Sequence, residues 1–371
     1  MKILSVHPFS LYSNGGGSRI LRRLYQGREA QVTSLVAQEF NSAPNRGEIE
    51  ESFVYAFPVT RKWMRWYLRD GVIWLRHKVF KSQTEKCIRK AAKSIACDVV
   101  HIVQHGPFPA ALCEPAFLTG KELWVSFHDH YSTTHTTRAD AEKLWNSATR
   151  RLAISEEYGR EYQRQFGDKP FEIITDGVDE SEISPPSNKL EQPTTIYFAG
   201  LLHMHYQPLF RVLADALDLL SKQGMQFKLV LRATQYLDFL NNRSFITEYK
   251  PLTLNNAVLK EELDAAAILY LPIKFTMPDF YLYSLSTKMV GYLGASGAIF
   301  YHGPLDSAAC NMLQVATAAE CCGTLNADDV AKSITRLIDN KSRLSENAKL
   351  LAQKKFTLAT IQEQFWQTKL N

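Results

Sequence analysis

The chain has 371 residues, of which 45% are hydrophobic and 22% are charged, and its formal net charge is +5. This composition excludes an intrinsically disordered chain, and the length exceeds what one hydrophobic core usually organises, so two domains are expected. The longest strongly apolar stretch, residues 265–273, is far shorter than a membrane span, and the N-terminal apolar run is too short and interrupted for a signal peptide. We therefore expect a cytoplasmic protein.

The first half of the chain alternates short apolar runs with helical segments. A strand at residues 2–6 precedes a glycine loop at residues 14–18, and a helix begins near Ile20. Further strands are predicted at residues 31–36, 52–57, 99–103, 123–127, 151–154 and 171–174. This alternation predicts a mostly parallel sheet with right-handed crossovers.

The pattern starts again after residues 179–193, a segment with two adjacent prolines and no apolar periodicity. The second half carries predicted strands at residues 194–198, 227–231, 268–272 and 298–301, and predicted helices at residues 209–220 and 287–293. The sequence therefore predicts an α/β fold with two Rossmann-like domains. Their expected ranges are residues 1–180, a linker at 181–193, residues 194–350, and a C-terminal helix at 351–371 that packs back on the N-terminal domain.

Several motifs follow one another in the order in which a known enzyme family carries them. They are the glycine loop at residues 14–18, Phe127-His128-Asp129, residues 153–156, residues 174–179, residues 197–200 and residues 285–297. Their order and spacing resemble the retaining GT-B glycosyltransferases of glycosyltransferase family four. The resemblance implies two Rossmann-like domains facing across a cleft, with the acceptor on the N-terminal side and a nucleotide-sugar donor in the C-terminal domain.

The sequence departs from the family pattern at three positions. The two glutamates of the family align with Tyr283 and Gly291, and the arginine expected just after Gly200 is replaced by Leu201. By resemblance, those glutamates bind the donor's sugar and ribose. We therefore expect altered donor recognition, with Tyr283 and its neighbours taking over by hydrogen bonding or stacking.

A glycine turn after the first strand suits a phosphate. Gly15, Gly16 and Gly17 offer backbone amides near a helix N-terminus without side-chain obstruction, and such amides favour an anion. The alternative is a plain tight turn.

Lys288 lies just inside a predicted helix, so its ammonium and the positive end of the helix dipole are both candidates to contact a diphosphate. The alternative is a solvated surface lysine. The predicted donor-binding residues of the C-terminal domain are Gly200, Arg232, Tyr283, Ser286, Thr287 and Lys288.

Arg232 ends a predicted strand, and strand carboxyl ends line the ligand crevice of an open α/β sheet. It is a candidate to supply the positive charge missing at Leu201. A salt bridge within the domain is the alternative role.

The densest cluster of titratable groups consists of His128, Asp129 and His130 at the end of a predicted strand. We predict His128 and Asp129 as catalytic residues: a neutral histidine hydrogen-bonds a sugar hydroxyl, and Asp129 orients it or accepts the acceptor's proton. If the reaction inverts the anomeric configuration, Asp129 is the candidate base. A structural aspartate that caps the next turn is the alternative.

Positive charge is concentrated at residues 61–93, which contain eleven Lys or Arg and two acidic residues. The net charge of this segment is therefore +9, and that of the remaining chain is −4. Basic and aromatic residues at helical spacing predict contact with an anionic membrane surface or an acceptor carrying phosphate. The alternative is an ordinary amphipathic helix with a solvated basic side, and nucleic acid is disfavoured. The residues proposed for this role are Arg61, Arg65, Arg69, Arg76, Trp63 and Trp66.

Together these features predict a glycosyltransferase that moves a sugar from a nucleotide-sugar to a cell-envelope glycan or lipid-linked acceptor. No Asp-x-Asp motif and no cysteine spacing typical of a metal site occurs, so we expect no metal and no cofactor. We expect a peripheral position on the inner face of the membrane. The alternative function is a catalytically silent GT-B domain that binds a glycan or a partner enzyme.

Overall fold

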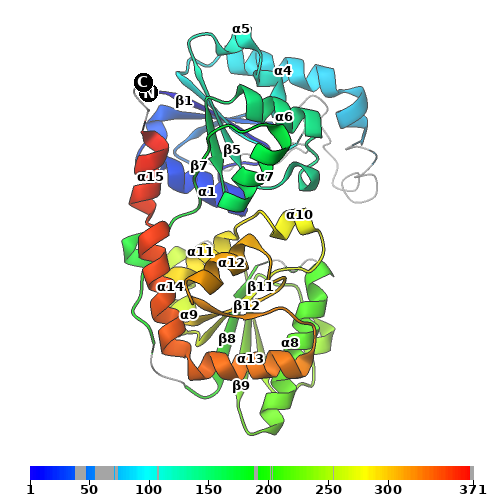
Figure 1. Cartoon of the computed structure of the whole chain (residues 1–371), viewed down its shortest axis with the longest axis vertical. Coiled ribbons are helices and arrows are strands. Elements are labelled where there is room, and N and C mark those ends of the chain that lie inside the picture. The colour runs from blue at the N-terminus through cyan, green and yellow to red at the C-terminus, as the bar shows by residue number, and fades with distance from the viewer. Residues whose placement is uncertain are drawn as a thin grey trace. The chain divides into compact units, whose positions relative to one another are not determined.

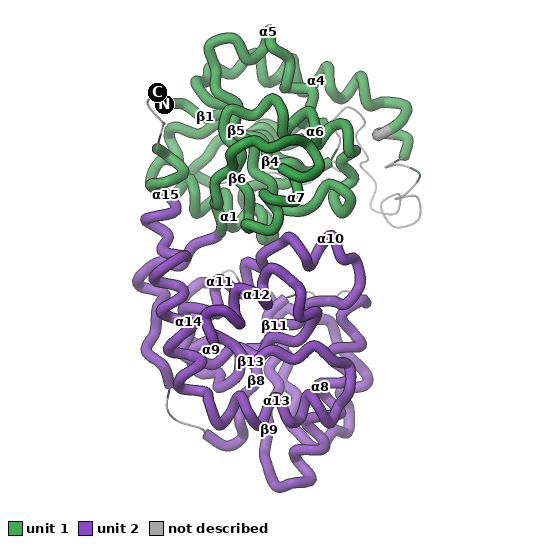
Figure 2. Tube along the Cα trace, in the orientation of Figure 1, with its two compact units in different colours: residues 1–175, 362–371 green, residues 176–361 purple. Residues whose placement is uncertain are grey.

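The computed structural model describes residues 1–37, 47–54, 71, 74–106, 108–187, 191–200, 202, 204–253 and 255–367. It contains two compact α/β units (Figure 2): unit 1 is residues 1–175 with 362–371, and unit 2 is residues 176–361. Within the described residues, no helix has both the length and the apolar character that spanning a membrane requires.

Unit 1 is built on a sheet of seven parallel strands in the order β3-β2-β1-β4-β5-β6-β7 (Figure 1). The strands are β1 (Ile3–His7), β2 (Val32–Val36), β3 (Glu50–Phe53), β4 (Val99–Val103), β5 (Glu122–Phe127), β6 (Arg150–Ala153) and β7 (Glu172–Ile173). Every residue of β1 and β4 is buried, as expected for central strands covered on both faces.

Helices cover both faces of this sheet. On one face α1 lies beside α15, where Tyr25 meets Phe365 edge to face and the Trp366 indole donates to the Leu24 carbonyl at 2.7 Å. Ser155 and Thr137 begin α7 and α6 by accepting a backbone N–H with their hydroxyls, the usual role of an N-cap. The helices are α1 (Gly16–Tyr25), α4 (Lys81–Lys93), α5 (Pro115–Leu118), α6 (Arg138–Ser147), α7 (Glu156–Phe166) and the part of α15 (Leu358–Trp366) from residue 362 on.

Unit 2 is built on a second parallel sheet, of six strands in the order β10-β9-β8-β11-β12-β13 (Figure 1). The strands are β8 (Thr194–Ala199), β9 (Phe227–Arg232), β10 (Ile246–Lys250), β11 (Ile268–Pro272), β12 (Ala298–His302) and β13 (Ala319–Cys322). Its core contains the aromatic residues Phe198, Phe210, Tyr270 and Phe300. Both units therefore have the strand order of a Rossmann-like sheet.

The helices of unit 2 also lie on both faces of their sheet. Helices α8 and α13 pack against each other on one face, and α11 and α14 pack together on the other. The helices are α8 (Gln207–Lys222), α9 (Asn256–Ala265), α10 (Pro278–Tyr281), α11 (Thr287–Gly294), α12 (Ala308–Val315), α13 (Ala327–Asp339) and α14 (Lys341–Lys355).

The structure confirms the predicted α/β class with two parallel sheets, and most predicted strands agree to within one or two residues. The third predicted strand is shifted, since β3 ends at Phe53, and residues 55–57 lie outside the described part of the chain. Two strands, β10 and β13, escaped the sequence analysis. Both are edge strands: β10 carries Glu248 and Lys250, and β13 has only four residues, so neither shows a buried apolar run.

The proline-containing segment expected as a linker lies along unit 2. The Ser184 backbone N–H donates to the Gly294 carbonyl at 2.8 Å, and its hydroxyl donates to Asp264 at 2.6 Å. Ser187 continues the contact through the Ser296 carbonyl. The first of these bonds pairs the carbonyl of the last residue of α11, at the end where a helix leaves backbone acceptors without partners inside the helix.

Candidate active site

Each sheet has a topological switch point, where two neighbouring strands are connected onward to strands on opposite sides of the sheet. It falls between β1 and β4 in unit 1, and between β8 and β11 in unit 2. Ligands of open parallel sheets bind at the carboxyl ends of the strands beside such a point. The candidate residues in each unit are therefore those that follow these strands.

In unit 1, the predicted glycine loop is shorter than expected. Gly15 is the N-cap of α1, and Gly16 and Gly17 already form its first turn, so the loop is the start of a helix. The N-cap Gly15 has no side chain and so makes no capping bond to these first amides, which lie at the positive end of the helix dipole. A Cβ at Gly17 would lie 2.6 Å from the Phe9 ring, so this glycine permits the close packing of Phe9.

The segment before α1, residues 10–13, is fixed by side chains of β3 and of α1. Glu51 accepts hydrogen bonds from the Ser10 hydroxyl at 2.5 Å and from the Leu11 backbone N–H at 2.8 Å. The Arg22 guanidinium donates to the carbonyls of Leu11 and Ser13. Neither Glu51 nor Arg22 was singled out from the sequence, because no local pattern shows which carboxylate meets this loop.

His128 and Asp129 follow β5, at the same edge of the sheet. His128 is 8% exposed, and burial lowers its pKa to about 4, against the attraction of the neighbouring Asp129. The imidazole is therefore neutral at pH 7, as expected for a group that hydrogen-bonds a hydroxyl. Asp129 is partly exposed.

The turn at residues 128–130 is fixed by the tyrosines of α7. The Tyr158 hydroxyl donates to the Asp129 backbone carbonyl at 2.6 Å, and the Tyr162 hydroxyl donates to Gln104 at 2.6 Å. The His130 ring contacts the hydroxyl of Ser132, two residues further along the chain, at 2.8 Å. Of the three predicted titratable groups, His130 therefore has a structural position.

Two further histidines that the sequence analysis missed lie at this edge. His7 ends β1, stacks on Phe9 with ring centroids 5.4 Å apart and has its pKa lowered to about 4 by burial. His105 follows β4 and meets the same Phe9 ring edge-on at 6.4 Å, and its charge depresses the pKa of His128. They come from separate strands, and only the strand order β1-β4-β5 brings them together.

In unit 2, Lys288 lies in the first turn of α11 beside the end of β8. Its Nζ is 5.2 Å from the centre of the Phe198 ring, and a Cβ on Gly200 would lie 2.9 Å from it. Gly200 has φ of 140°, so the backbone turns here in a conformation that side chains disfavour, and the space is left to the lysine.

The Lys288 ammonium is partly buried and has no hydrogen-bond or ion-pair partner among the described residues. Burial lowers its pKa, and no neighbouring carboxylate offsets that effect. Ser286 is the N-cap of α11 and makes no side-chain capping bond. A cation that has no partner among the described residues, at a helix N-terminus that its N-cap side chain leaves uncapped, is an arrangement that favours an anion.

The remaining predicted donor residues lie near Lys288 in the chain. Thr287 begins α11, and Tyr283 lies between α10 and α11 and is partly exposed. No contact between either side chain and Lys288 is present among the described interactions. Their assignment to the donor therefore stays a prediction.

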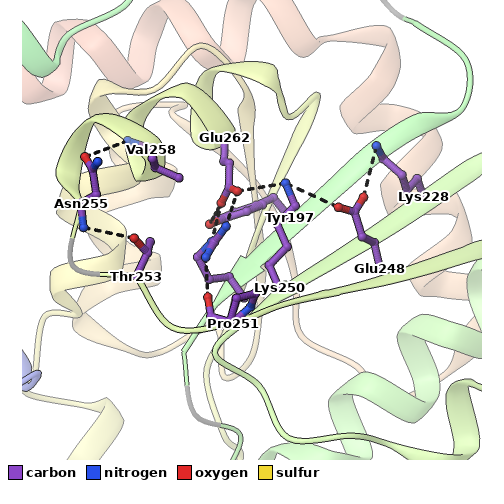
Figure 3. Close-up of polar contacts among 10 residues, drawn as sticks. Tyr197, Lys228, Glu248, Lys250, Pro251, Thr253, Asn255, Val258 and Glu262 are labelled. Atoms are coloured by element: carbon purple, nitrogen blue, oxygen red, sulfur yellow. Dashed lines mark hydrogen bonds and ion pairs between the residues drawn. The ribbon is translucent and has the colours of Figure 1, made fainter.

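The structure favours the salt-bridge role for Arg232. Its guanidinium makes a two-point ion pair with Glu262 of α9 and donates to the Pro251 carbonyl. Glu262 also accepts from Lys250 at 2.9 Å and from the Tyr197 hydroxyl at 2.9 Å, as Figure 3 shows. These donors lower the Glu262 pKa to about 2, despite burial. Arg232 therefore neutralises Glu262 and is a poor candidate for the phosphate.

The predicted basic aromatic surface lies mostly outside the described residues. This applies to Arg61, Arg65, Arg69, Trp63 and Trp66, and to the side chain of Arg76. The described part of the segment shows an exposed Trp74 and, on α4, the exposed lysines Lys86, Lys90 and Lys93, which have no ion-pair partner among the described residues.

In the described part of the chain, no group of three or more His, Cys, Asp or Glu side chains lies close enough together to hold a metal ion.

The two units together define the GT-B fold, which similar solved structures confirm. HepE from Anabaena in complex with UDP is 14% identical, aligned over 98% of each chain, with a TM-score of 0.68. Sucrose-phosphate synthase from Thermosynechococcus elongatus is 11% identical over 98% of this chain and 97% of that one, with a TM-score of 0.68.

A trehalose-6-phosphate synthase, studied for glycosyl transfer with retention, is 11% identical over 98% of each chain, with a TM-score of 0.65. No protein-family model and no curated protein sequence matches the chain. The similarity therefore lies in the fold.

Proposed function

We propose that this protein is a glycosyltransferase that uses a nucleotide-sugar donor. The observation that carries the proposal is the partly buried ammonium of Lys288, which has no hydrogen-bond or ion-pair partner among the described residues and lies in the first turn of α11, beside Gly200. Burying a cation is costly unless an anion compensates it. A diphosphate leaving group supplies that anion, and stabilising it is the main electrostatic task of this reaction.

We propose a uridine diphosphate sugar as the donor. HepE is described in complex with UDP and with UDP-glucose, and both structures cover this chain almost end to end. Tyr283 and Gly291 replace the glutamates of the family-four pattern, so the sugar and ribose contacts of this chain must differ from that pattern.

The acceptor chemistry is proposed for the carboxyl edge of the sheet in unit 1. A neutral His128 hydrogen-bonds a sugar hydroxyl, and Asp129 orients the acceptor. In the reaction, the bond between the anomeric carbon and the diphosphate breaks, and the acceptor oxygen forms a new bond to that carbon. We propose that the configuration is retained, that the departing diphosphate takes the acceptor's proton, and that no metal is required.

The acceptor itself is proposed to be a cell-envelope glycan or a lipid-linked sugar. The exposed lysines of α4 and the exposed Trp74 support contact with an anionic membrane surface. We propose a peripheral position on the cytoplasmic face of the membrane for this reason.

A second candidate function is a catalytically silent GT-B domain that binds a glycan or a partner enzyme. The observation in its favour is the absence of both family glutamates, at Tyr283 and Gly291. Under this alternative, the Lys288 site can still bind a nucleotide, and sugar transfer does not occur.

The test is nucleotide binding followed by turnover. Thermal stability is measured with UDP, GDP, ADP and their sugar derivatives, since a ligand at a hundred times its dissociation constant adds about 2.7 kcal/mol to stability. Lys288→Ala is expected to weaken UDP binding by about 1.5 to 3 kcal/mol and uridine binding hardly at all. Lys222→Ala, an exposed lysine of α8, is the matched control.

Equal losses for UDP and uridine would place Lys288 away from the phosphates. Binding of a nucleotide-sugar without hydrolysis or transfer to any acceptor sugar would favour the silent domain.

A further inference from the structure

Four hydrogen bonds join the loops that follow β8 and β9. The Gly200 backbone N–H donates to the Arg232 carbonyl at 2.9 Å, and the Thr234 hydroxyl donates to the Gly200 carbonyl at 2.9 Å. Two more come from Gln235: its amide nitrogen donates to the Leu202 carbonyl, and its amide oxygen accepts the Leu202 backbone N–H at 3.3 Å. One carboxamide thus pairs with both polar groups of one residue, as a neighbouring strand would.

The geometry of the second loop makes these bonds possible. Ala233, between Arg232 and Thr234, has φ of 56°, in the left-handed region that residues other than glycine rarely adopt. Such strain persists where surrounding contacts hold it, and it clusters at functional sites. Here it accompanies the turn that directs Thr234 and Gln235 back to the loop after β8.

The loop that Gln235 holds is the one that faces Lys288. Gly200 approaches the lysine so closely that an added Cβ would lie 2.8 Å from Cε and 2.9 Å from Nζ. A shift of this backbone by an ångström toward the lysine would occupy the space around Nζ, and a shift away would expose Nζ to water. Leu202 is 3% exposed, so the clamp anchors the loop to the core of unit 2.

We propose that Gln235 is a positioning residue for the donor's diphosphate: by clamping Leu202, it keeps the Gly200 backbone where Lys288 holds its ammonium open to the anion. Thr234 has the same role at the Gly200 carbonyl. This inference rests on the function proposed above. The sequence at this position, Arg232-Ala233-Thr234-Gln235, carries no local signal for it, because the partner is 33 residues away.

The test compares the binding of UDP with the binding of uridine to the 371-residue chain by calorimetry. Gln235→Ala is expected to raise the Kd of UDP about ten-fold, since two hydrogen bonds to the loop are lost, and to leave the Kd of uridine within about two-fold. Thr234→Val keeps the side-chain shape and is expected to raise the UDP Kd about three-fold. Gln314→Ala, an exposed glutamine of α12 with no side-chain hydrogen bond among the described contacts, is the matched control.

A double variant tests whether Gln235 acts through Lys288. If it does, adding Gln235→Ala to Lys288→Ala weakens UDP binding by less than about two-fold more, because the contact that the clamp positions is already gone. Full additivity, or equal losses for UDP and uridine, overturns the inference. If Lys288→Ala weakens UDP binding but Gln235→Ala and Thr234→Val leave it unchanged, this inference alone is overturned. If the parent protein binds no nucleotide, the proposed function is overturned as well.

Discussion

Buried neutral histidines stand at strand ends in both units. His7 and His128 in unit 1 and His302 in unit 2 all have pKa values lowered to about 4, with burial as the main cause. In His302 both ring nitrogens are engaged, by the Tyr270 hydroxyl at 2.9 Å and the Thr324 carbonyl at 2.7 Å. These groups therefore act at neutral pH through hydrogen bonds and contribute no charge.

Asp129 is the residue for which unit 1 permits the cleanest test. Asp129→Asn preserves the shape of the side chain, and the turn is held by bonds to the backbone carbonyl of this residue. We expect turnover to fall ten-fold or more, the low end for an acid-base or positioning group, with a melting temperature within about 2 °C of the parent. Steady-state kinetics with the best donor and thermal unfolding measure the two effects.

The control for this variant is Asp168→Asn, at an exposed position in the same unit. Its turnover should match that of the parent. Full activity of Asp129→Asn would leave Asp129 with a structural role only.

The C-terminal end of α15 is held by a buried arginine, Arg150. The Arg150 guanidinium donates to the carbonyls of Phe365 at 2.8 Å and Gln364 at 3.0 Å, and it pairs with Glu172 at 2.8 Å. It also lies over the Trp124 ring at 4.3 Å. The last carbonyls of a helix lack partners within the helix and carry partial negative charge, so a cation here both caps and anchors α15.

Arg150→Met is expected to destabilise the protein by about 3 kcal/mol or more, because Glu172 and the helix carbonyls lose a buried partner. Arg160→Met removes an exposed i,i+4 pair with Glu156 and is expected to cost less than about 0.5 kcal/mol. Chemical denaturation of both variants gives the comparison. Similar losses for the two would show that Arg150 contributes no more than a surface charge.

Helix α4 presents three exposed lysines, Lys86, Lys90 and Lys93. Each cation near an anionic bilayer contributes about 1 kcal/mol, so replacing all three with glutamine should weaken binding to anionic liposomes about 100-fold at low salt. The effect should shrink at physiological ionic strength, where the Debye length is about 8 Å. Co-sedimentation with anionic and neutral liposomes measures it.

A triple glutamine variant of Lys222, Lys354 and Lys355, exposed lysines of unit 2, changes the net charge equally and is the control. Equal weakening in both triple variants would indicate a general charge effect and no specific surface on α4.

The buried histidines make the free energy of unfolding of this protein depend on pH. A histidine with a folded pKa of about 4 binds its proton more readily when unfolded, where the pKa is 6.5. Stability is therefore complete above pH 6.5 and is lost as the pH falls toward 4. At pH 5 the loss is about 2 kcal/mol for each of the three histidines. Glu262, with its pKa lowered to about 2, adds a further loss only below about pH 4.5.

Thermal unfolding at pH 7 and pH 5 tests this dependence. The melting temperature should fall on acidification, and His302→Gln, which keeps a donor and an acceptor, should lower stability at pH 7 and flatten the difference between the two pH values. A parent protein equally stable at both pH values would show that these histidines are protonated in the folded state without cost.

The GT-B fold is shared with structures only 11 to 14% identical to this chain. Such similarity survives because parallel sheets need only buried apolar strands and covering helices, which many residues supply. Catalysis and binding depend on particular side chains, and a shared fold does not fix those. Fold and chemistry must therefore be argued separately for this protein.

The sequence by itself determined the α/β class, most strand positions and the candidates Lys288, His128 and Asp129. These depend on apolar runs, on glycine, and on residues that end a predicted strand or begin a predicted helix, all of which are local properties of the chain. The prediction differed from the structure where the local signal is weak. Gly16 and Gly17, expected in a loop, belong to a helix, and the strands β10 and β13 were not predicted.

Only the tertiary structure decided which side chains meet. It pairs Arg232 with Glu262, 30 residues further on, and Gln235 with Leu202. It also brings His105, after β4, to the ring of Phe9, after β1. The reason is that these contacts follow from the strand order of each sheet, in which neighbours are distant in the chain, and no pattern within a short window of sequence encodes that order.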